Sequence, residues 1–217
     1  MSDFPGGPQQ AFDPGVPSSS GEADEACPFC TIASAYAPYA PTRPPTADAS
    51  SISPWRVTPA AFVVLSTETL VAFLDIMPLS RGHVLLCPRA HRGRLTETTA
   101  AEAAELGAHL RLLSRALVRA VGVPDWNVVQ NNGAAAAQVV DHVHYHLIPR
   151  PELRAEPSPL RRSFTMFGRG VREELDDDEA ARLAVRLREC LAEVLLEEQQ
   201  QQQRQHQQQK GAIKEKL

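Results

Sequence analysis

The sequence predicts an α+β domain: an antiparallel five-stranded sheet with one main helix, followed by a C-terminal helix. Five short segments carry the apolar patterns of strands, and only one long helical pattern interrupts them. Consecutive strands with a single intervening helix are typical of an antiparallel α+β domain. The length of 217 residues provides one such core with extensions.

The strands are predicted from their apolar residues and from the turn signals between them. Residues 62–66 (FVVLS) and 70–76 (LVAFLDI) are separated by the polar TET, which indicates a hairpin. Residues 82–88 (GHVLLCP) and 126–130 (WNVVQ) are the third and fourth strands. The fifth is predicted over 139–148, a run that is rich in Val, Tyr, Leu and Ile and is followed by a proline.

The main helix is predicted over residues 100–121. Thr99 and Glu102 have the spacing of a capping box at its start, and Gly122 and Pro124 stop it. Its buried face is marked by leucines at helical spacing, at Leu106, Leu110, Leu113 and Leu117.

The C-terminal helix is predicted to begin at the acidic run DDDEA, because negative charge is favourable at a helix N-terminus. Its inner face is marked by Leu183, Leu187, Leu191 and Leu195. The Gln-rich residues that follow have a low-complexity composition that is compatible with helix, with disorder or with self-association.

Composition divides the chain into six segments. Pro, Gly, Ser and acidic residues predict disorder near the N-terminus and flexibility in an insertion. The segments are a disordered tail (1–25), a Cys-x-x-Cys island that docks on the core (26–37), a Pro/Ser-rich insertion (38–60), the core domain (61–151), a C-terminal extension with a helix (152–198) and a Gln-rich tail (199–217).

Charge and hydropathy exclude several classes of function. The net charge is −4 and no dense basic cluster occurs, so we expect no strong nucleic-acid binding. No apolar run has the length of a membrane span. The N-terminus lacks the pattern of a secretory signal, which predicts a cytoplasmic or nuclear protein with reduced thiols. Cys87 and Cys190 lie in apolar patterns and are predicted to be core thiols.

Three histidines occupy alternate positions in the stretch DHVHYHLIPRP. On a strand, His142, His144 and His146 share one face, whereas the residues between them face the core. A half-buried strand with a polar face is the simplest explanation, but groups that titrate near neutral pH more often form a site. Such a row suits either a catalytic metal or nucleophilic attack at phosphorus. Since the outer two lie about 13 Å apart on a regular strand, the spacing favours the nucleophile.

The chain resembles the histidine-triad (HIT) family of nucleotide hydrolases and transferases. HVHYHLI resembles the motif that names the family, and LVAFLDIMPLSRGHVLLCPRAH (70–91) resembles its nucleotide-pocket segment. The segments VVQNNG and AQVVDHVH resemble the loop and strand that lead into the triad. Together these similarities cover about residues 62–151 and the Cys island.

The resemblance implies an enzyme that acts on the α-phosphate of adenine nucleotide derivatives through a nucleotidyl-histidine intermediate. It makes His144 the nucleophile, oriented by the backbone carbonyl of His142. It places His146 beside the phosphate and His83 beside the triad, as a support. It assigns nucleotide contacts to Asp75, at the ribose, and to Asn131 and Gln138, near the phosphates. The chain departs from the family at Val139, where a Ser or Thr is common near the leaving group.

The pair in CPFC has two interpretations. A glutaredoxin-like redox pair is rejected, because no thioredoxin pattern follows it. Some histidine-triad relatives carry such a pair as half of a structural zinc site. The resemblance then implies a Cys2His2 set, which suits tetrahedral zinc, formed by Cys27, Cys30, His91 and His142. Two buried thiols without metal remain the alternative.

The resemblance leaves the substrate and the assembly open. The substrate is an adenosine phosphoramidate or an adenylylated compound, with dinucleoside polyphosphates as an alternative. A nucleotide-binding interaction module with incidental turnover is a second alternative, and a metal-dependent hydrolase a third. Small residues on a second face of the main helix (Ala103, Ala104, Gly107 and Ala108) and the family's habit of pairing through this helix predict a homodimer.

Overall fold

The computed structural model describes residues 27–151 and 172–214. The predicted N-terminal tail (1–25), the first part of the C-terminal extension (152–171) and the last three residues therefore lie outside the described residues.

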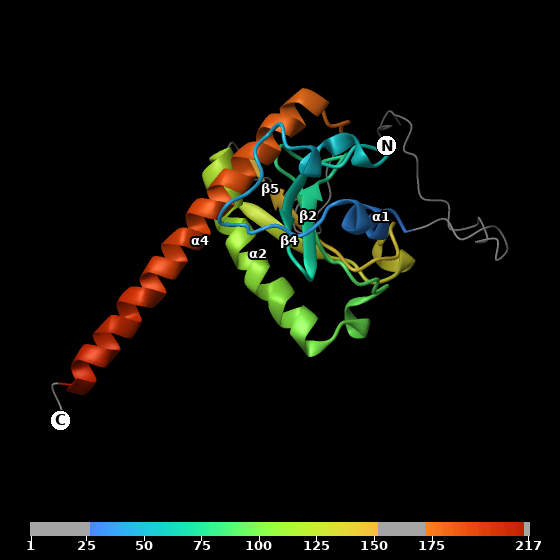
Figure 1. The fold of residues 1–217 in the computed structure, drawn as a ribbon. Helices are drawn as coiled ribbons and strands as arrows, with labels where there is room; N and C mark the ends of the chain where they lie inside the picture. The colour runs from blue at the N-terminus through green and yellow to red at the C-terminus, as the bar shows by residue number, and fades with distance from the viewer. Residues whose placement is uncertain (1–26, 152–171, 215–217) are drawn as a thin grey trace, which may run out of the picture.

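The centre of the fold is a five-stranded antiparallel sheet in the order β1-β2-β3-β5-β4 (Figure 1). Its strands are β1 (Val63–Ser66), β2 (Leu70–Leu74), β3 (Val84–Pro88), β4 (Trp126–Gln130) and β5 (Tyr145–Pro149). The predicted fold class is confirmed, and most strand boundaries agree with the sequence within two residues. β4 lies at one edge, where it pairs with β5 alone among the described strands.

The fifth strand differs from its prediction, because it begins at Tyr145 rather than at residue 139. β3 ends at Pro88, which has no N–H to continue the ladder. The Pro88 carbonyl instead accepts a hydrogen bond from the His142 ring, and the Val143 N–H turns to the Arg92 carbonyl. His142 and His144 consequently precede the strand, and only His146 lies within it.

Helices cover both faces of the sheet. α1 (Pro28–Ala35) packs on one face, where alternate strand residues such as Val71, Phe73 and Leu85 meet Phe29. α2 (Ala100–Val121) and α4 (Asp177–Lys214) pack on the other face, against the intervening residues of the same strands (Figure 1). The alternation of the strands thus separates two apolar clusters, one on each face.

α2 begins and ends as the sequence predicts. The Thr99 side chain accepts the Glu102 N–H, and the Glu102 carboxylate accepts the Thr99 N–H. Gly122 ends the helix with φ = 72°, a conformation that glycine adopts without steric cost. Of the predicted leucine stripe, Leu110 is only partly buried; the buried members are Leu106, Leu113 and Leu117.

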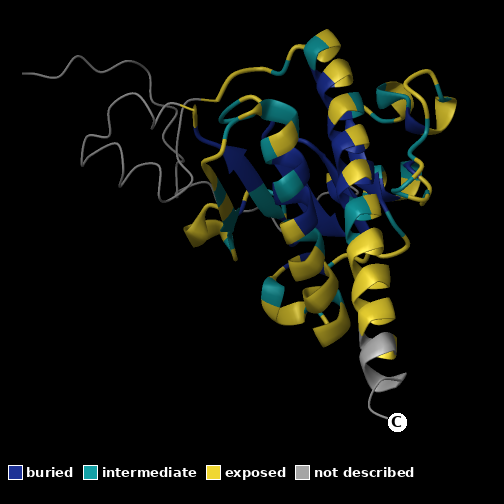
Figure 2. Ribbon diagram, turned by 90° about the vertical axis from the view of Figure 1, so that its left-hand side faces the viewer, coloured by how far each residue is buried: buried dark blue, intermediate teal, exposed yellow. Residues whose placement is uncertain are grey.

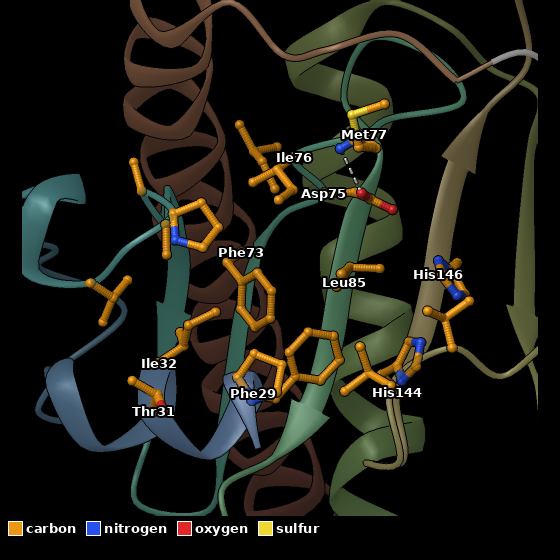
Figure 3. A pocket seen from close by; sticks show the side chains of 18 of the residues that line it. Phe29, Thr31, Ile32, Phe73, Asp75, Ile76, Met77, Leu85, His144 and His146 are labelled. Carbon is orange, nitrogen blue, oxygen red and sulfur yellow. Dashed lines mark hydrogen bonds between the residues drawn. The ribbon is translucent and has the colours of Figure 1, made fainter. Parts of the chain in front are cut away.

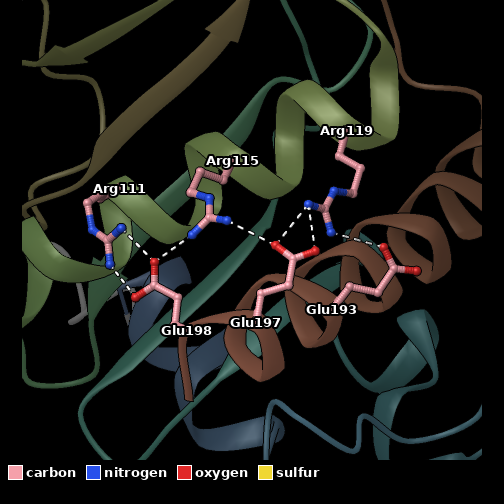
Figure 4. A network of polar contacts seen from close by, with 6 residues as sticks. All are labelled: Arg111, Arg115, Arg119, Glu193, Glu197 and Glu198. Atoms are coloured by element: carbon pink, nitrogen blue, oxygen red, sulfur yellow. Dashed lines mark hydrogen bonds and ion pairs between the residues drawn. The ribbon is translucent and has the colours of Figure 1, made fainter. Parts of the chain in front are cut away.

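α4 lies against α2 along an apolar seam bordered by ion pairs. Leu183, Leu187 and Leu191 enter the core, as predicted, together with Cys190. Arginines on α2 alternate with glutamates on α4 (Figure 4), namely Arg111, Arg115, Arg119, Glu193, Glu197 and Glu198. Exposed ion pairs are individually weak, so the apolar seam stabilises the contact and the charges fix its register.

The helix α4 continues through the Gln-rich segment and projects beyond the body (Figure 2). Side chains described from residue 199 onward are exposed. Among the described residues, no helix combines the length and apolar character that crossing a membrane requires.

Residues 38–60, predicted as a flexible insertion, instead contact the body through specific groups. They contain the short 3-10 helices η1 (Ser50–Ile52) and η2 (Pro54–Arg56), and Ile52 is buried. The Tyr36 hydroxyl lies between the carbonyls of Ser53, Pro54 and Ala61. Proline-rich composition alone does not reveal these long-range contacts, because it carries no periodic apolar pattern.

The Cys-x-x-Cys island docks on the core, and hydrogen bonds from Arg89 hold it there. The Arg89 guanidinium donates to the backbone carbonyls of Ala33, Tyr36 and Thr67, which joins the end of α1 to the β1–β2 turn. Two further 3-10 helices, η3 (Leu95–Glu97) and η4 (Ala134–Ala136), lie in the loops around the histidine row.

Candidate active site

A cavity of about 560 Å³ opens beside β5 on the α1 side of the sheet. Figure 3 shows its two regions. Phe29 from α1 and Phe73 and Leu85 from neighbouring strands form apolar walls, whereas His144 and His146 lie at the far end. Such a cavity suits a ligand with a flat apolar part joined to a reactive polar group.

The hydrogen bond of His144 fixes which ring nitrogen carries its proton. Nδ1 lies 2.6 Å from the His142 carbonyl oxygen. A carbonyl oxygen only accepts, so Nδ1 is the protonated nitrogen of the neutral ring and Nε2 keeps its lone pair. His144 lines the cavity, and the unprotonated Nε2 of its neutral ring has the lone pair that a nucleophile requires.

A second chain of bonds sets the proton on His146. The Leu79 N–H donates to His83 Nδ1 (3.1 Å), so the neutral ring of His83 carries its proton on Nε2. That nitrogen lies 2.9 Å from His146 Nδ1, to which it donates. The remaining proton of His146 is consequently on Nε2. The sequence-based placement of His83 beside the triad agrees with this contact.

Burial keeps these rings neutral. It lowers the pKa of His83 and that of His146 to about 3, with smaller contributions from neighbouring positive charges. Burial also lowers the pKa of His144, although the bond to the His142 carbonyl opposes this shift. A neutral imidazole is the nucleophilic form, so the site is ready to react at neutral pH.

Asp75 lies at the end of β2, where its carboxylate lines the cavity and is mostly buried. Oδ1 accepts the Met77 N–H (2.9 Å), a local turn contact, and Oδ2 faces Arg172 Nη1 (2.9 Å). The structure thus brings Asp75 to the same cavity as the histidines.

The two predicted phosphate-side residues differ in position. Asn131 lines the cavity. Gln138 does not line it, because its amide holds the loop together: Oε1 accepts the Gly133 N–H, and Nε2 donates to the carbonyls of Gly93 and Val140. Both amide hydrogens of Gln138 are used within the loop, and its contact with a nucleotide stays a prediction.

A second group of side chains meets on the other side of His142. The ligand atoms of Cys27, Cys30, His91 and His142 all lie within 4.8 Å of one another. Nδ1 of His142 is 3.4 Å from the sulfur of Cys27 and 3.6 Å from that of Cys30, and His91 Nδ1 is 3.4 Å from Cys30. In tetrahedral zinc with bonds of about 2.3 Å to sulfur and about 2.0 Å to nitrogen, these edges measure about 3.6 Å.

The protonation of His142 also fits a metal ligand. Its Nε2 donates to the Pro88 carbonyl (2.9 Å), which leaves the Nδ1 lone pair directed at the two sulfurs. Burial lowers the pKa of His142, so the ring is neutral. The four residues predicted as a set therefore form a group that can hold a metal ion.

Two residues that line the cavity were not predicted from the sequence. Arg172 lies after the core domain and reaches the cavity from the segment before α4. Phe29, between the two cysteines, forms a wall of the cavity and an edge-to-face contact with the His144 ring (5.0 Å between centroids). Its position between Cys27 and Cys30 could have indicated this role, because contacts that hold the two cysteines in place also hold Phe29.

Comparison with known proteins relates the chain to one family. The HIT domain model matches residues 57–153. An adenosine 5'-monophosphoramidase of Schizosaccharomyces pombe is 42% identical over 85 residues, which cover 39% of this chain and 61% of that protein. Another of Candida albicans is 33% identical over 139 residues, 62% of this chain and 85% of that protein.

A solved structure is also similar. A zinc-bound histidine triad family protein of Mycobacterium smegmatis is 28% identical, with a TM-score of 0.54. The similarity covers 78% of this chain and 95% of that one. The chain matches about three fifths of the S. pombe relative's own length, so that relative's activity does not transfer by similarity alone.

The depressed histidine pKa values predict a loss of stability in mild acid. Below pH 6.5 the unfolded chain protonates His83 and His146, whereas the folded chain does not until about pH 3. Stability is therefore full above pH 6.5 and falls as the pH decreases, by up to about 2 kcal/mol per histidine between pH 7.5 and 5. Urea unfolding at several pH values measures the loss.

Two matched variants test whether His83 and His146 cause this pH dependence of stability. His83→Asn should reduce the pH dependence, whereas His206→Asn, at an exposed position of α4, should leave it unchanged. A free energy of unfolding that stays constant from pH 7.5 to 5 would contradict neutral, buried His83 and His146.

Proposed function

We propose that this chain, which belongs to the HIT family, hydrolyses adenine nucleotide derivatives at the α-phosphate, with an adenosine phosphoramidate or another adenylylated compound as substrate. The observation that carries the proposal is the bond from His144 Nδ1 to the His142 carbonyl, which leaves Nε2 as a nucleophile at the cavity. The relatives named adenosine 5'-monophosphoramidases support the same reaction.

The cavity is proposed to bind the nucleotide in one orientation, with the base, the ribose and the phosphate at different residues. The adenine ring lies against the apolar wall that Phe29 and Phe73 form together through their edge-to-face contact, and it excludes water from both side chains. Asp75 accepts hydrogen bonds from the ribose hydroxyls, and Asn131 lies on the phosphate side. This order brings the α-phosphate to His144 and His146.

The reaction is proposed to take two steps. His144 Nε2 attacks the α-phosphorus, a P–N bond forms, and the bond from phosphorus to the leaving group breaks. The leaving group keeps the electron pair and takes a proton from water, while His146 Nε2–H donates a hydrogen bond that stabilises the developing charge. A second water then attacks phosphorus and gives its proton to the hydroxide left by the first step. The electron pair of the P–N bond returns to His144 Nε2, and AMP is released.

The His142 carbonyl supports both steps. When His144 bears the nucleotidyl group its ring is cationic, and the Nδ1–H···O bond becomes charge-assisted and stronger. The position Val139 is 92% exposed at the cavity and offers no hydroxyl to the leaving group. Assistance to the leaving group therefore falls to His146.

Zinc is proposed at the Cys27, Cys30, His91 and His142 group, because these side chains provide a Cys2His2 donor set with tetrahedral spacing. When bound, the ion would supply structural cross-linking and no catalytic step. It would join α1, which carries Phe29, to the segment that carries His142 and His144.

A homodimer is proposed through α2 and the edge strand β4. Trp126 and Val128 are exposed on β4, and the Trp126 indole donates to Ser114 on α2, so helix and strand form one continuous surface. The small residues predicted for pairing are all exposed, at Ala103, Ala104, Gly107 and Ala108. We further propose a cytoplasmic or nuclear location, since cysteine ligands must stay reduced to bind a metal.

His144→Asn is expected to lower kcat by at least about 1000-fold, because the attacking nitrogen is lost. AMP affinity should stay within about threefold, since Asn can still donate to the His142 carbonyl. Steady-state turnover of adenosine phosphoramidate and calorimetry with AMP measure the two effects, and His206→Asn is the control. Substantial turnover by His144→Asn would remove the nucleophile from this position.

Zinc content is expected to be close to one ion per chain in protein purified without added metal. The double variant Cys27→Ser, Cys30→Ser should lose the ion and unfold at a lower temperature, because the ion links α1 to the core. Cys190→Ser, whose thiol lies in the other apolar cluster, should keep the ion. Elemental analysis with thermal unfolding measures both, and metal-free wild type of normal stability would contradict the site.

Light scattering is expected to give a mass of twice 23.7 kDa for the wild type at micromolar concentration. Gly107→Glu should shift it to one chain by placing like charges together at a two-fold axis. Gly107→Ala should remain dimeric, because it adds no charge at the axis and its Cβ meets no atom of its own chain within 4 Å. A wild-type mass near one chain would contradict the dimer.

A further inference from the structure

Arg172 places a positive charge at the cavity. It lies outside both the histidine row and the core domain. It belongs to the segment immediately before α4 and lines the cavity together with His144 and His146. Its Nη1 donates to Asp75 Oδ2 at 2.9 Å and to the Met77 carbonyl. The side chain is 42% exposed, whereas that of Asp75 is 10% exposed.

The bonds to Asp75 leave its carboxylate half occupied. Each carboxylate oxygen has two acceptor positions. Oδ1 uses one for the Met77 N–H, and Oδ2 uses one for Arg172. His83 Nδ1, 3.5 Å from Oδ2, accepts from Leu79 and so adds no donor. One acceptor position therefore remains on each oxygen, a pattern that matches two adjacent hydroxyl groups.

Two fixed donors on different oxygens also fix the plane of the carboxylate. The Met77 N–H is local to the chain, whereas Arg172 comes from a segment 97 residues later. A carboxylate held only by Met77 rotates about its Cβ–Cγ bond. Loss of Arg172 would thus reduce the fraction of Asp75 oriented for a two-point contact.

We propose that Arg172 is a positioning residue that holds Asp75 ready for the two ribose hydroxyls and so makes the chain select ribonucleotides over dideoxyribonucleotides. The inference rests on the proposed function, since it names how that site recognises the sugar. The competing assignment is a direct contact of Arg172 with substrate phosphates, but in the described structure its Nη1 is bonded to the Asp75 carboxylate and to the Met77 carbonyl.

The test compares two substrates with full-length chain: adenosine 5'-phosphoramidate and its 2',3'-dideoxy analogue. Arg172→Met should lower kcat/KM for the ribonucleotide about tenfold, mainly through KM, and that for the dideoxy analogue less than twofold. Arg172→Lys should restore most of the loss, because an ammonium group can donate to Asp75. Arg186→Met, which removes a surface ion pair with Glu189, is the control and should change neither substrate.

A double-variant cycle separates action through Asp75 from action on the substrate. In an Asp75→Ala background, Arg172→Met should cause no further loss. Equal losses for both substrates, or an additional loss in the Asp75→Ala background, would overturn the proposal. Circular dichroism establishes that each variant is folded.

Binding gives a readout that does not depend on turnover. Calorimetry should show Arg172→Met weakening AMP about tenfold and leaving 2',3'-dideoxy-AMP within twofold of wild type. If the wild type binds both nucleotides but hydrolyses neither substrate, the proposed function fails while this comparison still decides the role of Arg172. Equal weakening of both nucleotides overturns the inference.

Discussion

The backbone carbonyl of His142 is the point on which the site depends. It accepts the His144 Nδ1–H at 2.6 Å, and this one bond determines which nitrogen of the His144 ring keeps its lone pair. The ring of the same residue donates to the Pro88 carbonyl and directs its other nitrogen at Cys27 and Cys30. One residue therefore orients the His144 ring through its backbone and joins the island to the sheet through its side chain.

These two roles of His142 require that β5 begins only at Tyr145. If the pairing of β3 with β5 continued from Leu86 and Tyr145 to Pro88, the His142 ring could not bond the Pro88 carbonyl. Breaking the ladder there releases His142 and His144 into a bend, where their rings diverge to two neighbouring sites. Loss of the few ladder bonds costs little, because the Val143 N–H and the Pro88 carbonyl both find other partners.

Burial determines the charge of the histidine rings, and the chain of hydrogen bonds determines which nitrogen carries each proton. His83 and His146 are neutral because desolvation outweighs every favourable charge near them, and the Leu79 N–H sets the direction of both protons. The group of Cys27, Cys30, His91 and His142, the apolar walls of the cavity and His144 share α1 as a common support, since Phe29 touches the ring of His144. A change at Cys27 or Cys30 is consequently expected to reach the cavity.

The sheet and α2 could be predicted from the sequence, because periodicity and capping are local signals, whereas the candidate site residues were predicted from the resemblance to the family. Thr99 with Glu102, and the apolar runs of β2 and β3, needed no tertiary information. The start of β5 could not be predicted, since it depends on Pro88 lying opposite Val143 in space. The loop contacts of Gln138 could not be predicted for a related reason: its partners Gly93 and Gly133 meet its amide only in the folded chain. Arg172 carried no signal, because only the folding of α4 onto α2 brings it to Asp75.

The most direct test of this account is the tautomer of His144 in the resting protein. Long-range proton–nitrogen NMR of histidine-labelled chain, with His144→Asn to assign the signals, distinguishes a protonated ring nitrogen from an unprotonated one. At neutral pH we expect a neutral ring with the proton on Nδ1 and an unprotonated Nε2. A ring protonated on Nε2, or on both nitrogens, would contradict the claim that the His142 carbonyl holds His144 ready to attack phosphorus.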